Sequence, residues 1–226
     1  MAARKNPDLL VVAAHLPELS GLRRRLGDGL RSDVAGIDVS AEAVGIGLPA
    51  AASGMAARFE RSRPRAVILI GTCGAYDGCG LEIGQVVVGR RVRLVSAAVA
   101  AEKGVFPEPL STVFDTDAAL FERLCGAGMS AVDVATTLAI TIDGGLASTL
   151  CRRESCAVEH LEAFAVVQCA ASYRVPFAIV LGVANRCGAG AREQWRANQR
   201  RAGVGAAAHV VAWLERGAPG LRGSPR

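Results

Sequence analysis

A carboxylate in an apolar segment is the first sign of chemistry in this sequence. The stretch VEHLEAFAV predicts a helix in which Glu162 lies one turn from Val158 and Val166, on the stripe that should be buried. Burial of an unpaired carboxylate costs on the order of several kcal/mol, so this side chain needs a partner or a task. A salt bridge to one of the many arginines and a role in a binding site both fit the pattern.

Other polar or glycine-rich positions follow apolar runs that predict buried strands. Glu18, the segment 71–75 and Asn185 each come shortly after such a run, as does the region around Gly144. In open α/β sheets, ligands bind at the carboxyl ends of strands, so these positions can share one site. Each also has a structural explanation, because Glu18 suits the first turn of a helix, the glycines suit a tight turn, and Asn185 suits a cap.

The elements that would position these residues alternate between strands and helices. This order predicts an α/β fold with one three-layer αβα domain, in which helices cover both faces of a twisted, mixed central sheet. The pattern predicts strands at 9–14, 41–44, 65–71, 85–95, 135–142 and 177–184, and helices at 16–26, 48–63, 117–125, 146–153, 159–173 and 192–216.

The length of 226 residues suits one domain, which we place at residues 1–216. The Gly-, Pro- and Ser-containing end, residues 217–226, is predicted to be disordered. No apolar run approaches the roughly 18 residues of a membrane span, and the basic N-terminus lacks the pattern of a signal peptide. We therefore expect a cytoplasmic protein without a transmembrane helix.

Charge and cysteine content argue against two other classes of protein. The net charge of +5 comes mainly from dispersed arginines, and aromatic residues make up 4% of the chain, so a nucleic-acid surface is poorly supported. The seven cysteines form no C-x-x-C pair and have no histidine at ligand spacing. We expect buried free thiols, no metal and no cofactor.

Several of these segments resemble the purine nucleoside phosphorylase and nucleosidase superfamily. VGIGLPAAASGMAARF resembles its glycine turn and helix, LIGTCGA its strand and glycine loop, and VEHLEAF its ribose-binding Met-Glu motif. VPFAIVLGVANRCGAGAREQW resembles the strand that ends at the residue contacting the base. The likeness spans about residues 9–215. The Asn ending, with Trp195 behind it, is most similar to the futalosine hydrolases, nucleosidases of an alternative menaquinone pathway.

The resemblance implies a role for each polar residue in cleaving an N-glycosidic bond. Glu162 would bind the ribose hydroxyls, Glu18 would orient or deprotonate the attacking water, and Asn185 would hold the N7 edge of the purine. A negative carboxylate beside the sugar also favours the positive charge that develops there. The other substrate-binding residues that we expect are Thr72, Gly74, Ala75, Leu161 and Phe164.

The choice of base and nucleophile depends on particular positions. A carboxamide at Asn185 can accept from N7–H and donate to a 6-oxo group without titrating, which favours release of hypoxanthine. Phosphorylases of the hexameric branch carry an arginine two residues before the loop glycine and a Gly-Asp-x-x-Arg turn after the first strand. Here those places hold Leu69 and AAHLPEL, so water is the better nucleophile.

Other positions depart from the family pattern. Leu161 replaces a methionine, Ala163 a glycine, and Leu181-Gly182 the usual Arg-Ala, while Val183-Ala184 stands for Ile-Ser. A phosphorylase, an adenosine-type nucleosidase and a nucleoside-binding protein without turnover are the alternative functions. The resemblance also implies a homo-oligomer, at least a dimer, that acts on a small purine nucleoside.

Overall fold

The strand β1 (Leu9–Ala13) shows how the chain covers both faces of its sheet. In this computed structural model, which describes residues 6–126 and 128–221, every residue of β1 is buried. Leu9, Val11 and Ala13 belong to one hydrophobic cluster, whereas Leu10 and Val12 belong to the other. Because side chains alternate between the faces of a strand, β1 separates two cores.

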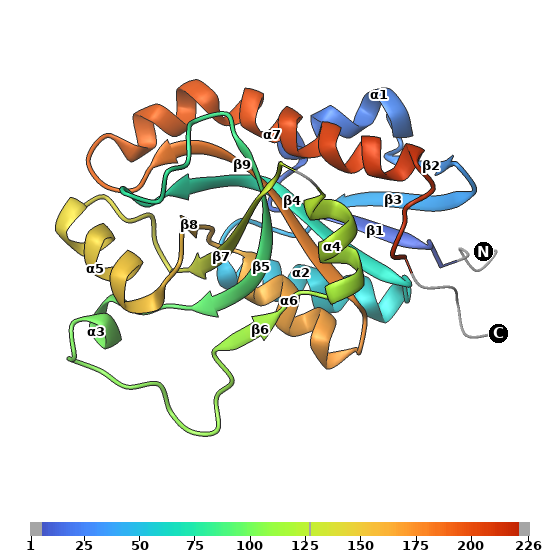
Figure 1. Cartoon of the computed structure of the whole chain (residues 1–226). Helices are drawn as coiled ribbons and strands as arrows, with labels where there is room; N and C mark the ends of the chain where they lie inside the picture. The colour runs from blue at the N-terminus through green and yellow to red at the C-terminus, as the bar shows by residue number, and fades with distance from the viewer. Residues whose placement is uncertain (1–5, 127, 222–226) are drawn as a thin grey trace.

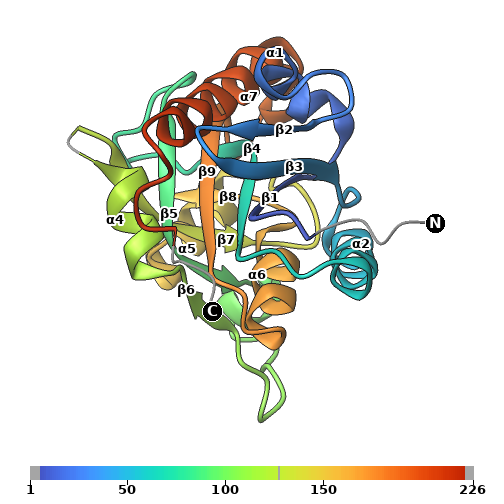
Figure 2. The same ribbon diagram turned by 90° about the vertical axis from the view of Figure 1, so that its right-hand side faces the viewer.

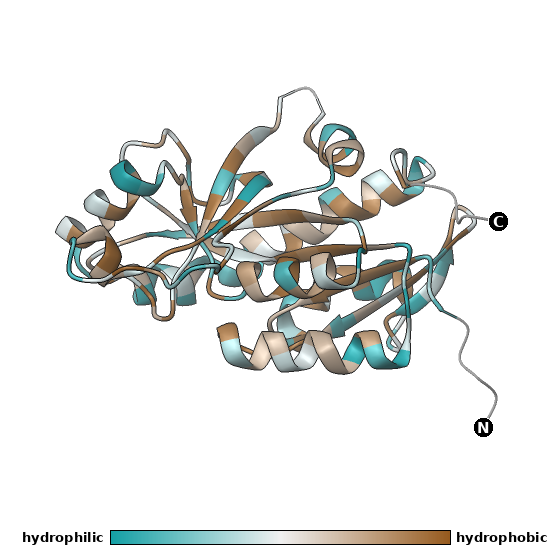
Figure 3. Ribbon diagram, turned by 90° about the horizontal axis from the view of Figure 1, so that it is seen from below, coloured by the Kyte–Doolittle hydropathy of each residue, from teal (hydrophilic) through white to brown (hydrophobic). Residues whose placement is uncertain are grey.

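Helices pack on the two faces in separate groups. The long helix α7 (Ala191–Glu215) contributes Trp213 and Leu214 to one core, beside α4 (Ala118–Cys125). The opposite core contains residues of α2 (Leu48–Arg61) and α6 (Ala163–Ser172). Figures 1 and 2 show α7 above the strands and α2 and α6 below them, which confirms the α/β layering. The strands are largely hydrophobic, and the helices carry both kinds of residue (Figure 3).

The nine strands of the described residues form one mixed sheet, and eight of them follow the order β2-β3-β1-β4-β8-β7-β5-β6. The strand β9 pairs parallel with β4 and antiparallel with β5, so pairing runs in a closed ring through β4, β9, β5, β7 and β8. The remaining strands are β2 (Arg31–Val34), β3 (Ile37–Ala43), β4 (Ala66–Ala75), β5 (Val86–Leu94), β6 (Val113–Asp115), β7 (Ser130–Thr136), β8 (Val158–Glu159) and β9 (Phe177–Arg186).

The expected helices are present, but they begin and end at residues other than those predicted. The segment after β1 forms a 3₁₀ helix, η1 (Leu16–Leu22), that continues into α1 (Arg23–Leu26), and α5 spans Gly144–Glu154. The short α3 (Ala97–Ala100) was not predicted. The helices of the described ranges are all too short or too polar to serve as membrane spans.

The predicted strand 135–142 is wrong beyond Thr136, where β7 ends. The apolar side chains of Leu138, Ile140 and Ile142 are exposed, so the alternation there does not mark a buried face. The amide of Thr141 donates to the Glu159 carboxylate at 3.0 Å and has no strand partner. This segment therefore runs as an irregular stretch that leads into α5.

The predicted helix 159–173 begins later than expected. Glu159 belongs to β8, and α6 begins at Ala163 with Glu162 at its N-cap. Nδ1 of His160 accepts hydrogen bonds from the amides of Glu162 and Ala163, which satisfies two amides that a longer helix would pair internally. Glu162 therefore lies at the N-terminus of the helix instead of on its buried stripe.

The segment 71–75 is part of β4 and does not form the expected loop or turn. It pairs with β9, with a register shift between Cys73 and Gly74. The neighbouring β9 is covered closely by α7, since a Cβ at Gly182 would lie 2.1 Å from the carbonyl oxygen of Ala202. Glycine at 182 thus permits the contact between strand and helix.

The C-terminal prediction is partly wrong. Residues 217–221 pack onto the domain, because Ala218 is buried and the Trp213 indole donates to the carbonyl of Pro219 at 3.0 Å. Residues 222–226 lie outside the described residues. All seven cysteines are free thiols, but only Cys73, Cys156 and Cys187 are buried and the others are half-buried.

Candidate active site

A cavity of about 420 Å³ lies at the carboxyl ends of β1, β4 and β9 and the N-terminus of α6. Ala14 follows β1, Thr72 lies in β4, and Asn185 lies near the end of β9. Parallel strands bring such positions to one edge of a sheet. Six of the predicted residues line this cavity: Glu18, Thr72, Gly74, Leu161, Glu162 and Asn185.

Glu18, in η1, is 9% exposed and is held by donors from two other segments. Its Oε2 accepts from the amide of Ala14 at 3.1 Å, and its Oε1 accepts from the amide and hydroxyl of Thr72 at 3.1 and 3.3 Å. Burial alone raises the pKa of a carboxyl group, but the neighbouring imidazoles of His15 and His160 and the amide of Thr72 together outweigh it, so the pKa of Glu18 is lowered. Glu18 is therefore an ionised, fixed carboxylate at neutral pH.

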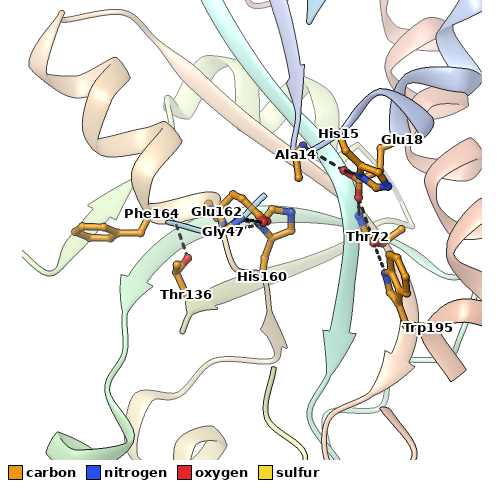
Figure 4. Close-up of polar contacts among 11 residues, drawn as sticks. Ala14, His15, Glu18, Gly47, Thr72, Thr136, His160, Glu162, Phe164 and Trp195 are labelled. Atoms are coloured by element: carbon orange, nitrogen blue, oxygen red, sulfur yellow. Dashed lines mark hydrogen bonds and ion pairs between the residues drawn. The ribbon is translucent and has the colours of Figure 1, made fainter. Parts of the chain in front are cut away.

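His15 and Trp195 extend the network around Glu18 (Figure 4). Nδ1 of His15 lies 3.2 Å from Oε2 of Glu18, a close ionic contact that lacks the alignment of a good hydrogen bond. This carboxylate raises the pKa of His15 against the effect of partial burial. The Trp195 indole donates to the Thr72 hydroxyl at 3.0 Å, so that hydroxyl can give its own hydrogen to Glu18.

Glu162 is 5% exposed and has few protein partners. Its Oε1 accepts from the amide of Gly47 at 2.6 Å, in the turn before α2. Its Oε2 lies 3.3 Å from Nδ1 of His160, but that nitrogen accepts two amide hydrogens whose positions the backbone fixes. Oε2 of Glu162 and Nδ1 of His160 are therefore close neighbours and do not form an ion pair. No arginine of the described residues pairs with Glu162, contrary to the salt-bridge alternative.

The Asn185 amide is oriented by its own backbone. Nδ2 donates to the carbonyl of Arg186 at 2.8 Å, and the side chain lies against Gly74 of β4. Among the described residues no donor reaches Oδ1, so this oxygen and the second hydrogen of Nδ2 are available. At 6% exposure, the amide presents one acceptor and one donor within the cavity.

Two predicted substrate-binding residues lie elsewhere. The ring of Phe164 packs in the core with its centroid 5.5 Å from that of Phe114, because its position in the first turn of α6 directs it away from the cavity. Ala75 is fully buried in β4, where it pairs with Val158 and Arg186. The structure therefore does not bring Phe164 and Ala75, which we expected to bind substrate, to the wall of this cavity.

Several residues that line the cavity were missed. Glu159 is one, and its carboxylate accepts from Tyr76 at 3.1 Å and from both the amide and the hydroxyl of Thr141. The segment VEHLE, which puts two acids three residues apart, was the available signal for it. The remaining missed residues are Ala14, His15, Ile46, Cys73, Ile140, Ile142, His160, Ala191 and Arg192.

The cavity combines two buried acids and a carboxamide that retain hydrogen-bonding capacity. Glu18 can accept a proton from a small nucleophile, and Glu162 can accept from hydroxyl groups. Across the described residues, no three His, Cys, Asp or Glu side chains come together as a metal-binding group. This arrangement suits acid–base chemistry on a neutral polar ligand with a heterocyclic edge.

Comparison with known proteins agrees with this geometry at the level of the family. The model of the phosphorylase superfamily matches residues 7–215, and the chain therefore belongs to that superfamily. No curated protein sequence matches the chain closely enough to count as a relative.

Solved structures of similar fold include nucleosidases from two bacteria. A 5′-methylthioadenosine/S-adenosylhomocysteine nucleosidase from Colwellia psychrerythraea, in complex with adenine, is 19% identical, with a TM-score of 0.78 over 93% of this chain and 95% of that chain. A mutant of the Helicobacter pylori nucleosidase, with 5′-methylthioadenosine in its active site, is 10% identical, with a TM-score of 0.85 over 93% of this chain and 99% of that chain. A futalosine hydrolase mutant from the same organism gives 12%, 0.78, 92% and 98%. At these identities the likeness shows the shared fold.

Proposed function

We propose that the protein hydrolyses the N-glycosidic bond of a purine nucleoside and releases a 6-oxopurine, hypoxanthine in the futalosine-hydrolase-like case. The observation that carries this proposal is the meeting of Glu18, Glu162 and Asn185 around one cavity of about 420 Å³. These three side chains match the three tasks of the reaction, which are to activate a nucleophile, hold the sugar and stabilise the departing base.

Glu162 would bind the sugar. With Oε1 on the Gly47 amide, Oε2 keeps room for ribose hydroxyl groups. The side chain of Glu162 is 5% exposed. Its negative charge stabilises the oxocarbenium-like sugar of the transition state more than it stabilises the neutral substrate. An interaction that strengthens as the bond breaks lowers the barrier of the chemical step.

Water is the nucleophile that the cavity suits better. Glu18 is held as an anion, and a carboxylate repels a phosphate dianion. Of the residues that line the cavity in the described chain, Arg192 alone carries a guanidinium group, and it is exposed. Leu69, at the position of the phosphorylases' arginine, is fully buried in β4. The carboxylate then takes the proton that water loses as it bonds to the sugar.

Asn185 would bind the purine base. Oδ1 can accept from N7–H while the free hydrogen of Nδ2 is donated to a 6-oxo group. A carboxamide has no proton to deliver at neutral pH, so it stabilises the departing base by hydrogen bonds alone. Specific donor and acceptor positions discriminate strongly, because a mismatched base leaves buried groups unpaired.

A 5′-methylthioadenosine or S-adenosylhomocysteine nucleosidase is the second candidate. Asparagine can also pair with the N6 and N7 edge of adenine, and the nucleosidases from Colwellia and Helicobacter share the fold. The experiment that separates the candidates incubates the protein with inosine, methylthioadenosine and futalosine, with and without phosphate. Hypoxanthine release without phosphate supports the proposal, whereas adenine release or a need for phosphate supports an alternative.

A nucleoside-binding protein without turnover is the third candidate. It would bind one of these nucleosides and release no base, and Glu18→Gln would leave that binding unchanged. Calorimetry on the same nucleosides therefore completes the assay.

We also propose a homo-oligomer in which a second subunit covers the mouth of the cavity. Ile46, Ile140 and Ile142 line the cavity yet are 66%, 49% and 69% exposed, and Leu138 beside them is 77% exposed. Exposed apolar side chains grouped at one place favour burial against a partner. Light scattering on wild type and on Ile142→Glu tests this expectation, since the variant should shift toward monomer.

A further inference from the structure

His160 lies between the two catalytic acids and has no role in the mechanism described above. It is 3% exposed, lines the cavity, and comes from the connection between β8 and α6. Figure 4 shows its ring between Glu162 on one side and Glu18 with Thr72 on the other. A buried imidazole in this place has two nitrogens to satisfy, and each faces a different environment.

The first nitrogen, Nδ1, is a cap for α6. It accepts from the amides of Glu162 and Ala163 at 3.2 and 3.1 Å, whereas the N-cap residue Glu162 makes no side-chain cap of its own. Because Nδ1 is an acceptor, the proton of the ring is assigned to Nε2. His160 therefore offers one N–H donor, and the backbone fixes its direction through the cap.

The second nitrogen, Nε2, faces the space above Gly71 in β4. A Cβ at position 71 would lie 3.2 Å from Nε2 of His160 and 3.1 Å from Oε1 of Glu18. Both atoms therefore line the side of Gly71 that carries no side chain. A water molecule in contact with this side, farther from the Cα atom than a Cβ would be, lies between Nε2 of His160 and Oε1 of Glu18. No protein acceptor for Nε2 is present among the described residues.

We propose that His160 is a catalytic residue that binds the attacking water through Nε2–H, opposite Glu18, in the space that Gly71 leaves open. This role rests on the proposed hydrolysis. The water oxygen bonds to C1′ of the sugar as the bond from C1′ to the base breaks and its electron pair leaves with the base. One water proton passes to Glu18, and the other stays on the new hydroxyl group. His160 keeps its proton, the base takes one from solvent, and Glu18 later returns its own to solvent.

Two substitutions separate the nitrogens of His160. In His160→Asn the side-chain oxygen lies near the position of Nδ1, so the cap is retained and the donor is lost. In His160→Gln the amide nitrogen lies near Nε2, so the donor is retained and the cap is lost. We expect His160→Asn to lower kcat by about 10-fold to 100-fold, with KM for the nucleoside within about threefold and little change in Tm. His160→Gln should lower Tm more and kcat less.

Thr136→Val is the matched control for the cap. The Thr136 hydroxyl accepts from the amide of Phe164 at 3.0 Å in the same turn of α6, and it does not line the cavity. We expect this variant to lower Tm as His160→Gln does, with kcat unchanged. Gly71→Ala adds a methyl group that crowds Oε1 of Glu18 and Nε2 of His160 and blocks the approach of the proposed water. It should abolish hydrolysis while hypoxanthine binding by calorimetry is retained.

The outcomes decide between this inference and the proposed function. A wild-type protein that releases no base overturns both. If wild type is active and His160→Asn keeps kcat within about twofold, the role of His160 is wrong and the hydrolase assignment stands. If His160→Asn does not fold, His160→Gln decides, because a kcat as low as that of His160→Ala contradicts the donor role.

Discussion

Glu18 accepts hydrogen bonds from two backbone amides and one hydroxyl, whereas the Glu162 carboxylate accepts one, from the amide of Gly47. The first carboxylate is fixed by the protein, and the second keeps capacity for a ligand. Both are buried, so burial alone does not separate them. This difference fits the proposed roles, because a carboxylate that orients one small nucleophile is best held rigidly, whereas a carboxylate that binds substrate keeps an oxygen free.

The largest expected effect is that of Glu162→Gln. It removes the charge that we propose to face the developing positive sugar, and should reduce kcat/KM on the order of 10³-fold or more. Steady-state kinetics on the preferred nucleoside measures the loss. Activity within a few-fold of wild type would refute the ribose role.

Glu159→Gln is the comparison for that result. The three hydrogen bonds that Glu159 accepts from Tyr76 and Thr141 show a structural carboxylate in the same cavity wall. Because those partners are buried, the change should lower Tm by several degrees more than Glu162→Gln does. Thermal unfolding of both variants tests this, and equal Tm values would mean that Glu162 is structural as well.

Glu18→Gln should have the next largest effect, about 10²-fold in kcat. The amide cannot take the proton of the attacking water, and the Ala14 and Thr72 amides lose an anionic acceptor. KM should change less than kcat, since in the proposed mechanism Glu18 contacts the attacking water and not the nucleoside. Single-turnover kinetics separates the two quantities, and a loss confined to KM would contradict the assignment.

Asn185→Asp should change the preference for the base by about tenfold or more. An aspartic acid can give a proton to N7 and accept from a 6-amino group, so the ratio of adenine to hypoxanthine released should rise. Competition between an adenine nucleoside and inosine, followed by chromatography, measures this ratio. A constant ratio would mean that the Asn185 side chain does not face the base.

His15→Gln should give the smallest effect, a shift in pH dependence. The pKa of Glu18 is lowered from 4.5, so wild-type kcat/KM should fall only below that pH, and the fall should begin at higher pH in the variant. The raised His15 pKa and the lowered Glu18 pKa both stabilise the fold between about pH 4.5 and 6.5. That contribution is lost as pH rises through the pKa of His15 or falls through that of Glu18. If kcat/KM falls at the same acidic pH in wild type and His15→Gln, the effect of His15 on the pKa of Glu18 is contradicted.

The main elements and the positions of three cavity residues were predictable because they depend on local pattern. Glu18 and Asn185 follow apolar runs, and Glu162 interrupts one, so periodicity marks these positions, whereas their expected roles came from the resemblance to the family. The contact that holds Glu162 was not predictable, because it comes from Gly47, 115 residues away. The two-residue strand β8 is equally invisible, since two residues show no alternation.

The errors have a common physical origin. Phe164 and the apolar residues of 137–143 were assigned by type, but their surroundings were decided by the late start of α6 and by the early end of β7. The sequence pattern did not mark His160 as a cavity residue. Its Nδ1 makes a local contact with the Glu162 amide, and its Nε2 faces Gly71, which is distant in the sequence. When the partners of a polar group come from distant strands, the role of that group therefore cannot be predicted until the fold is known.

The most direct test of the account identifies the products formed from inosine and futalosine in phosphate-free buffer by chromatography and mass spectrometry. The account predicts equal amounts of hypoxanthine and free sugar, with no increase in rate when phosphate is added. A sugar 1-phosphate formed only with phosphate present, or bound nucleoside recovered intact, would contradict it.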